Sequence, residues 1–187
     1  RQTVNGGTSV GFGYTVNTND YPVLLDYLPQ VRMIILTPTT AENLQATGAE
    51  GGLDFGLFPQ GGTAQPSFAS VSSGIYISQH RTPQFGAGAA ANNPLKWCVI
   101  VSKISAGFGS GAIQGSVIRE DVLDVANYTI YDLQIKFLNA TTFQVVINSF
   151  TKTYSFPAGT FPANTFFQLG SRLLSATGVG QNGAWIR

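Results

Sequence analysis

The chain has 187 residues, of which 43% are hydrophobic and only 10% are charged, whereas about 25% of a typical soluble domain is charged. Its net charge of +1, with no two Lys or Arg residues adjacent, excludes a strongly basic surface for nucleic acid or for an anionic membrane. The single cysteine, Cys98, excludes an internal disulfide framework.

Short segments in which apolar and polar residues alternate follow one another along the chain, separated by Gly, Pro and Asn. The clearest is 131–137, where Tyr131, Leu133, Ile135 and Phe137 would share one face. Single helical turns are expected within 20–28 and 40–45. In chain order the sequence predicts strands at 9–16, 31–36, 53–58, 73–79, 97–104, 112–118, 131–137, 143–147, 151–156 and 165–169.

Roughly ten to twelve short strands at this spacing predict an all-β fold, with two antiparallel sheets packed as a β-sandwich of the jelly-roll type. The segments 131–137, 143–147 and 151–156 are expected to form an antiparallel meander. No linker or charge block divides the chain, so we expect residues 1–187 to form one domain. Because the chain begins with Arg1 rather than Met, we expect it to be the C-terminal piece of a longer protein.

Residues suited to catalysis are scarce. The one histidine, His80, stands at the end of a predicted strand, where a surface or hydrogen-bonded role is typical. Cys98 lies in the apolar run 96–101, which favours a buried small hydrophobe over a reactive thiol. The glycines of 107–111 lack the Gly-Lys-Ser/Thr ending of a phosphate loop, and no Gly-x-Ser-x-Gly elbow occurs. The sequence therefore predicts a chain that is not an enzyme and has no catalytic residues.

Among the nine acidic residues the only cluster is Glu120, Asp121 and Asp124, in a predicted turn that runs to Asn127. A solvated loop is the simplest interpretation, because the spacing matches no calcium-binding loop. If the chain holds Ca²⁺, we expect it at these three carboxylates, and we expect no other cofactor. A pair distant in sequence, such as Asp54 with Glu120, stays open as the acid pair of a glycosidase.

The segment 82–94 is rich in Gly, Ala and Asn and lacks the periodicity of a strand, which predicts an exposed loop. Long loops on rigid sandwiches often carry binding sites, and sugar sites combine apolar surface with fixed polar groups. The sequence therefore gives a set of candidate ligand contacts in and beside this loop and near the C-terminus: His80, Arg81, Phe85, Asn92, Asn93 and Trp185.

The strands expected in 128–187 resemble the closing strands of a concanavalin- or laminin-G-like jelly roll. The resemblance covers about a third of the chain and rests on an alternating strand, two further strands ending in Pro157-Ala158-Gly159, the segment Phe167-Gln168-Leu169-Gly170 and a closing Gly183-Ala184-Trp185-Ile186. The charge-poor, Gly-, Asn- and Thr-rich whole also resembles, in style only, the C-terminal heads of bacteriophage tail fibres and tailspikes. Those heads are often trimeric β-sandwiches that bind host-surface glycans.

These resemblances imply a recognition domain that binds a host-surface carbohydrate or receptor and self-associates as a homotrimer. The expected location is a virion or the extracellular space, and neither nucleic acid nor an inserted membrane is expected as a partner. One alternative is a structural jelly-roll capsid or decoration protein. A second alternative is a hydrolase that acts on polysaccharide.

Overall fold

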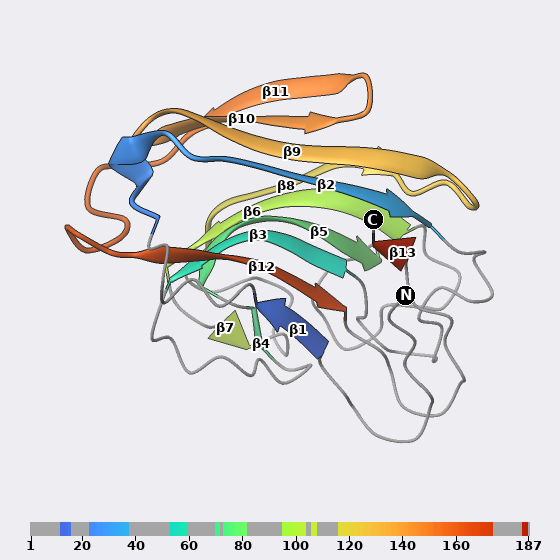
Figure 1. Cartoon of the computed structure of the whole chain (residues 1–187), viewed down its shortest axis with the longest axis horizontal. Helices are drawn as coiled ribbons and strands as arrows, with labels where there is room; N and C mark the ends of the chain where they lie inside the picture. Colours follow the sequence, from blue (N-terminus) through green and yellow to red (C-terminus); the bar gives the residue numbers. More distant parts are fainter. Residues whose placement is uncertain are drawn as a thin grey trace.

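The computed structural model describes residues 12–15, 23–37, 53–59, 70–71, 73–81, 95–103, 106–107, 116–173 and 185–186. Two antiparallel sheets lie one above the other as a sandwich (Figure 1). In spatial order, one sheet contains β1 (Phe12–Thr15), β12 (Phe167–Leu173), β3 (Leu53–Pro59), β5 (Gly74–Arg81), β6 (Leu95–Ser102) and β8 (Ser116–Asp124). The other contains β11 (Phe150–Ser155), β10 (Thr142–Ile147), β9 (Ile130–Asn139), β2 (Gln30–Leu36) and β13 (Trp185–Ile186).

Two smaller elements complete the described part of the chain. Strands β4 (Ser70–Val71) and β7 (Ala106–Gly107) pair with each other. A single 3-10 turn, η2 (Leu25–Tyr27), precedes β2 and confirms the helical turn expected within 20–28. The turn expected within 40–45 lies outside the described residues. The all-β jelly-roll sandwich predicted from the sequence is therefore confirmed.

The predicted meander is confirmed as β9, β10 and β11, which pair consecutively and antiparallel. Along β9 and β10 every second side chain is buried, as the alternating sequence requires. Ile135 of β9 lies between Val31 of β2 and Val145 of β10 in the register. These β-branched side chains pack side by side on the inner face of the sheet.

The core lies between the two sheets, and aromatic rings join them. Trp97 of β6 meets the ring of Tyr131 of β9 edge-on, with 5.0 Å between their centroids. Cys98, the next residue of β6, is fully buried on the other side of its sheet. Burial raises the pKa of its thiol, which therefore stays protonated. The prediction of a buried, unreactive cysteine is confirmed.

One predicted segment is placed wrongly by the sequence. Strand β8 begins at Ser116 and continues to Asp124, so the acidic cluster lies in a strand and not in a turn. Val122 and Leu123 pack against the core and hold this part of the chain to the sheet. The pairing of β6 with β8 shifts register twice, which disguises the alternation in the sequence.

Candidate functional site

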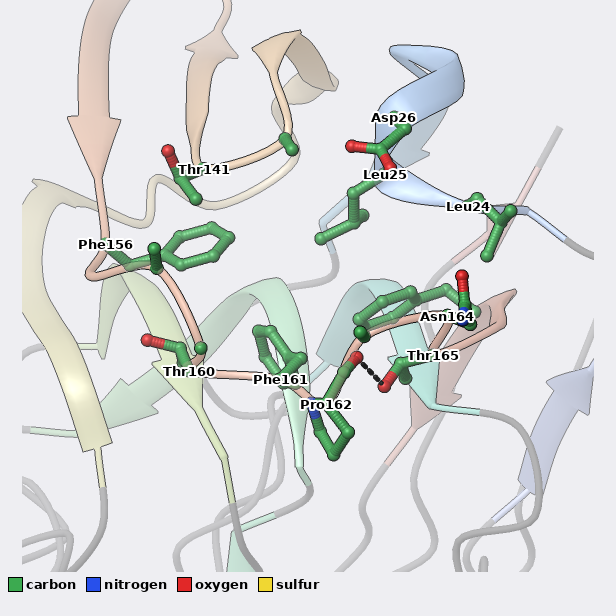
Figure 2. Close-up of a pocket in the computed structure, with 15 residues that line it drawn as sticks. Leu24, Leu25, Asp26, Thr141, Phe156, Thr160, Phe161, Pro162, Asn164 and Thr165 are labelled. Atoms are coloured by element: carbon green, nitrogen blue, oxygen red, sulfur yellow. Dashed lines mark hydrogen bonds between the residues drawn. The ribbon is translucent and has the colours of Figure 1, made fainter.

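A pocket of about 250 Å³ opens at the end of the sandwich where η2 leads into β2. Figure 2 shows three segments around it: η2 on one side, the β9–β10 turn at Thr141, and the connection from β11 to β12. Two backbone hydrogen bonds between Val23 and Phe167 tie the chain before η2 to the start of β12. Segments far apart in sequence are thus fixed to each other around the opening.

The connection from β11 to β12 is a tandem repeat of five residues, Phe-Pro-Ala-Gly-Thr at 156–160 followed by Phe-Pro-Ala-Asn-Thr at 161–165. Each repeat forms a four-residue turn whose third residue has positive φ: +79° at Gly159 and +61° at Asn164. Turns of type II require this conformation at the third position, and Gly and Asn adopt it most readily. The repeat therefore builds two equivalent turns side by side at the pocket.

Each turn is closed in the same way by its threonine. The backbone N–H and the hydroxyl of Thr160 both donate to the carbonyl oxygen of Pro157, at 3.2 Å and 2.7 Å. Thr165 makes the same pair of bonds to Pro162, at 3.2 Å and 2.6 Å (Figure 2). These bonds fix the turns, so the rim of the pocket is largely preformed.

Phenylalanine rings form the floor of the pocket. Phe161 packs edge-on against Phe156 on one side and Phe167 on the other, with centroid distances of 5.8 Å and 5.1 Å. Phe156 and Phe167 are buried, whereas Phe161 is half-buried. Leu25 of η2 also packs against this cluster and lies across the opening in Figure 2. The floor is therefore apolar and rigid.

Polar side chains stand around this floor. Asp26 of η2 and Asn164 of the second turn are exposed, and neither has a hydrogen-bond or ion-pair partner in the described part of the chain. Thr141 donates its hydroxyl and its backbone N–H to Asn139 Oδ1. An apolar floor with a few polar groups at its rim is the arrangement expected of a small-molecule site.

A second group of polar side chains lies on the outer side of the six-stranded sheet, which is concave in Figure 1. Asp54, Ser78, Cys98 and Asp121 stand in line across β3, β5, β6 and β8. Ser78 donates its hydroxyl to the Asp54 carboxylate, and both side chains are fully buried. Cys98 is fully buried as well, whereas Asp121 is exposed, so only one side chain of this row is open to solvent.

The proposed glycosidase pair is not brought together. Asp54 and Glu120 stand on opposite faces of the sheet, because Asp121 and not Glu120 lies in line with Asp54. Three strand spacings separate β3 from β8, about 14 Å. A glycosidase needs its two carboxylates about 5–9.5 Å apart.

The three carboxylates considered for Ca²⁺ have separate neighbours. Glu120 accepts two hydrogen bonds from Lys152 of β11, at 2.7 Å and 2.8 Å. Asp124 pairs with Lys96 at 2.5 Å, and Asp121 lies beside Cys98. Within the described ranges no group of three or more His, Cys, Asp or Glu side chains could hold a metal ion.

The described lining of the pocket includes none of the ligand contacts predicted from the sequence. The backbones of His80 and Arg81 lie where β5 ends, and Trp185 pairs with Leu36 where β2 ends (Figure 1). That end of the sandwich is opposite η2. Phe85, Asn92 and Asn93 lie outside the described residues. Their role in binding stays a prediction.

The pocket itself was missed by sequence reasoning, although the sequence carries a signal for it. The repeat at 156–165 is visible as two copies of Phe-Pro-Ala-x-Thr, with the two residue types that favour positive φ at the variable position. The first copy taken alone predicts only the end of a strand. Leu25 and Asp26 give no such signal, because η2 reaches the pocket through tertiary packing.

Comparison with known proteins defines the fold class. A legume lectin-like domain from Entamoeba histolytica matches with a TM-score of 0.50 and 14% identity, over 99% of this chain and 81% of that one. Alginate lyase A1-II′ of polysaccharide lyase family 7 matches with a TM-score of 0.45 and 9% identity, over 98% of this chain. Sheep galectin-11, solved with glycerol, matches with a TM-score of 0.37 and 8% identity over the whole of both chains.

The chain therefore has a concanavalin-like jelly-roll fold, as the resemblance of its last third implied. It spans 60% of the length of the alginate lyase. No protein-family model matches the chain, and no curated protein sequence matches it. No helix in the described ranges is long and apolar enough to span a membrane.

The prediction that the chain is not an enzyme is contradicted. Polysaccharide lyases stand among its structural neighbours: the family 7 enzyme, a second structure of a family 7 alginate lyase with product, and a family 18 lyase. At 8–10% identity these likenesses show the fold and assign no activity.

Proposed function

We propose that this chain binds carbohydrate in the pocket formed by η2, Thr141 and the two tandem turns. The observation that carries the proposal is the combination of a phenylalanine floor with a preformed polar rim. A sugar ring has an apolar face of C–H groups that packs on aromatic carbon and a circumference of hydroxyls that needs hydrogen-bond partners. The half-buried ring of Phe161 and the side chains of Asp26 and Asn164 supply both.

The size of the pocket agrees with this ligand class. Its volume of about 250 Å³ is slightly below the about 300–1,000 Å³ of pockets that enclose drug-sized molecules. One sugar ring fits such a space, with the rest of a glycan chain left in solvent. The lectin-like domain and the galectin among the structural neighbours add support at the level of the fold.

A glycan array identifies the carbohydrate, and titration calorimetry of the wild type and Asn164→Gly tests the site. Asn164→Gly removes the amide but keeps the turn, since Gly159 already occupies the equivalent place in the first turn. Losing one hydrogen bond to a ligand, worth about 0.5–1.5 kcal/mol, weakens Kd by about two- to ten-fold.

The matched control is Gln144→Ala, which removes an amide from β10, a strand that contributes no residue to this pocket. We expect its Kd to equal that of the wild type. Equal weakening in both variants, or none in Asn164→Gly, would place the carbohydrate elsewhere on the chain. An array without any bound glycan would remove the proposal.

We further propose that the domain works as the head of a viral fibre or tailspike, or as another attachment domain outside cells, and that it forms a homotrimer. The support is its charge-poor composition, since few Lys and Glu side chains need to be immobilised when subunits assemble. Sedimentation velocity tests the assembly. A sharp species of three times the chain mass is expected, whereas a monomer excludes the trimer and an open lattice favours the capsid alternative.

A further inference from the structure

We infer that the pocket selects neutral sugars over uronic acids and other anionic glycans, with Asp26 as the residue that sets this preference. The inference rests on the proposed function and names the substrate class of the same site. It follows from the charge and the hydrogen-bonding inventory of the residues that line the pocket.

The charge of the lining has one source. Among the described residues that line the pocket, Asp26 is the only ionisable one, and none of them is Lys, Arg or His. Figure 2 shows the Asp26 carboxylate at the opening, above Leu25 and opposite Thr141. No cation in the described part of the chain pairs with it. A ligand carboxylate in the pocket would therefore face an uncompensated like charge.

The threonine hydroxyls of the lining act on a ligand as acceptors. Thr160 and Thr165 give their hydroxyl protons to the carbonyls of Pro157 and Pro162. Thr141 gives its hydroxyl proton to Asn139 Oδ1. Each oxygen keeps lone pairs with which to accept from a ligand.

The remaining polar side chains of the lining, Asp26 and Asn164, also offer more acceptors than donors. The Asp26 carboxylate accepts only, and Asn164 is the one lining side chain with N–H donors that are not engaged within the described residues. A neutral sugar, whose hydroxyls all donate, matches a lining rich in acceptors. The carboxylate of a uronic acid is an acceptor without a proton and finds one donor side chain at most. Charge and hydrogen bonding thus favour the same ligands.

The experiment compares methyl glycosides of glucose, galactose and mannose with the methyl glycosides of the matching uronic acids. Binding to the isotope-labelled chain is followed by two-dimensional NMR, which reads affinity and location together. We expect at least one neutral glycoside to bind at the pocket about ten-fold more tightly than its uronic acid, as expected for one like-charge contact near the surface. Salt should narrow the difference, because it screens this repulsion.

Two variants with the same net charge test whether Asp26 causes the difference in affinity between neutral and acidic glycosides. Asp26→Asn should raise the affinity for the uronic acid and remove most of the ten-fold difference. Asp124→Asn makes the same change in net charge outside the pocket and should leave the difference intact. Equal affinities in the wild type, or tighter binding of the uronic acid there, would overturn the inference while leaving carbohydrate binding in place. Failure of every glycoside to bind would remove the proposed function and this inference with it.

Discussion

Two buried tyrosines make opposite use of their hydroxyl groups. Tyr131 Oη accepts from the backbone N–H of Ala126 at 2.8 Å and donates to the carbonyl of Asp124 at 3.3 Å. Tyr154 Oη is buried and has no hydrogen-bond partner of normal geometry among the described residues, although the Glu120 carboxylate is near enough to help raise its pKa. Burial raises the pKa of Tyr154 and keeps its phenol neutral. The same substitution should therefore have different consequences at the two positions.

Tyr131→Phe should lower the free energy of unfolding by about 1–3 kcal/mol, because it leaves the Ala126 N–H without its acceptor. Tyr154→Phe should leave stability unchanged or raise it by up to about 1 kcal/mol, because it removes an unpaired polar atom. Urea unfolding of both variants measures the two values. Similar losses in both would contradict the hydrogen-bond assignment.

Two aspartates carry opposite pKa shifts and should give opposite dependences on pH. Burial raises the pKa of Asp121, although the charge of Arg119 opposes the shift. Two hydrogen bonds from Arg32, at 2.8 Å and 2.7 Å, lower the pKa of Asp132. Asp121 therefore adds stability only below its unfolded pKa and loses this contribution as pH rises through its folded pKa. Asp132 adds stability above its unfolded pKa and loses it as pH falls through its folded pKa.

At pH 7 we accordingly expect Asp121→Asn to raise Tm and Asp132→Asn to lower it. Near pH 3 both differences should shrink, because both aspartates are then largely protonated in the unfolded chain. Asp121 is protonated in the folded chain as well, whereas Asp132, with its lowered pKa, loses the rest of its contribution only at still lower pH. Thermal unfolding across this range is the measurement. A fall in Tm for Asp121→Asn at neutral pH would show that its ionised form is stabilised by the fold.

At the scale of single elements, the tandem turns of 156–165 make a prediction that depends on backbone conformation alone. A Cβ added at Gly159 would meet no other atom within 4 Å, so only its φ of +79° opposes a side chain. Gly159→Ala should cost about 1–2 kcal/mol of stability, whereas Gly159→Asn should cost clearly less, since Asn already fills the equivalent position 164. The measurement is the free energy of unfolding of Gly159→Ala, Gly159→Asn and Asn164→Gly, each compared with the wild type. Equal costs for Ala and Asn would argue against the shared turn geometry.

The strands were largely predictable because one face of most of them is buried. Alternation is unbroken over 131–137 of β9, and every second residue of β10 is buried, which fixes most of their register. A shift between Thr142 and Phe143 is the part that alternation does not predict. The extent of β8 was not predicted, because two register shifts interrupt the alternation of apolar and polar residues and because clustered acidic residues are typical of loops. The site was less accessible, because residues of η2, the β9–β10 turn and the repeat meet only through tertiary packing. In the sequence, nothing distinguishes Asp26 and Thr141 from other surface residues, and only the fold brings them to the same pocket.

At the scale of the whole molecule, the pocket and the strand ends that carry His80, Arg81 and Trp185 lie at opposite ends of the two sheets (Figure 1). The pocket lies at the end where η2 meets the tandem turns. Proteins that share a fold can differ in activity, so the fold alone does not locate a binding site. The location of bound carbohydrate is therefore the decisive observation.

The most direct test is to map that location by NMR. Neutral methyl glycosides are titrated into the isotope-labelled chain, and changes in amide chemical shift are followed residue by residue. Our account predicts concentration-dependent changes at 24–26, at Thr141 and along 158–165, which Asn164→Gly weakens. Changes confined to the end of β5 around His80 and Arg81, or to the concave row at Ser78 and Cys98, would contradict it.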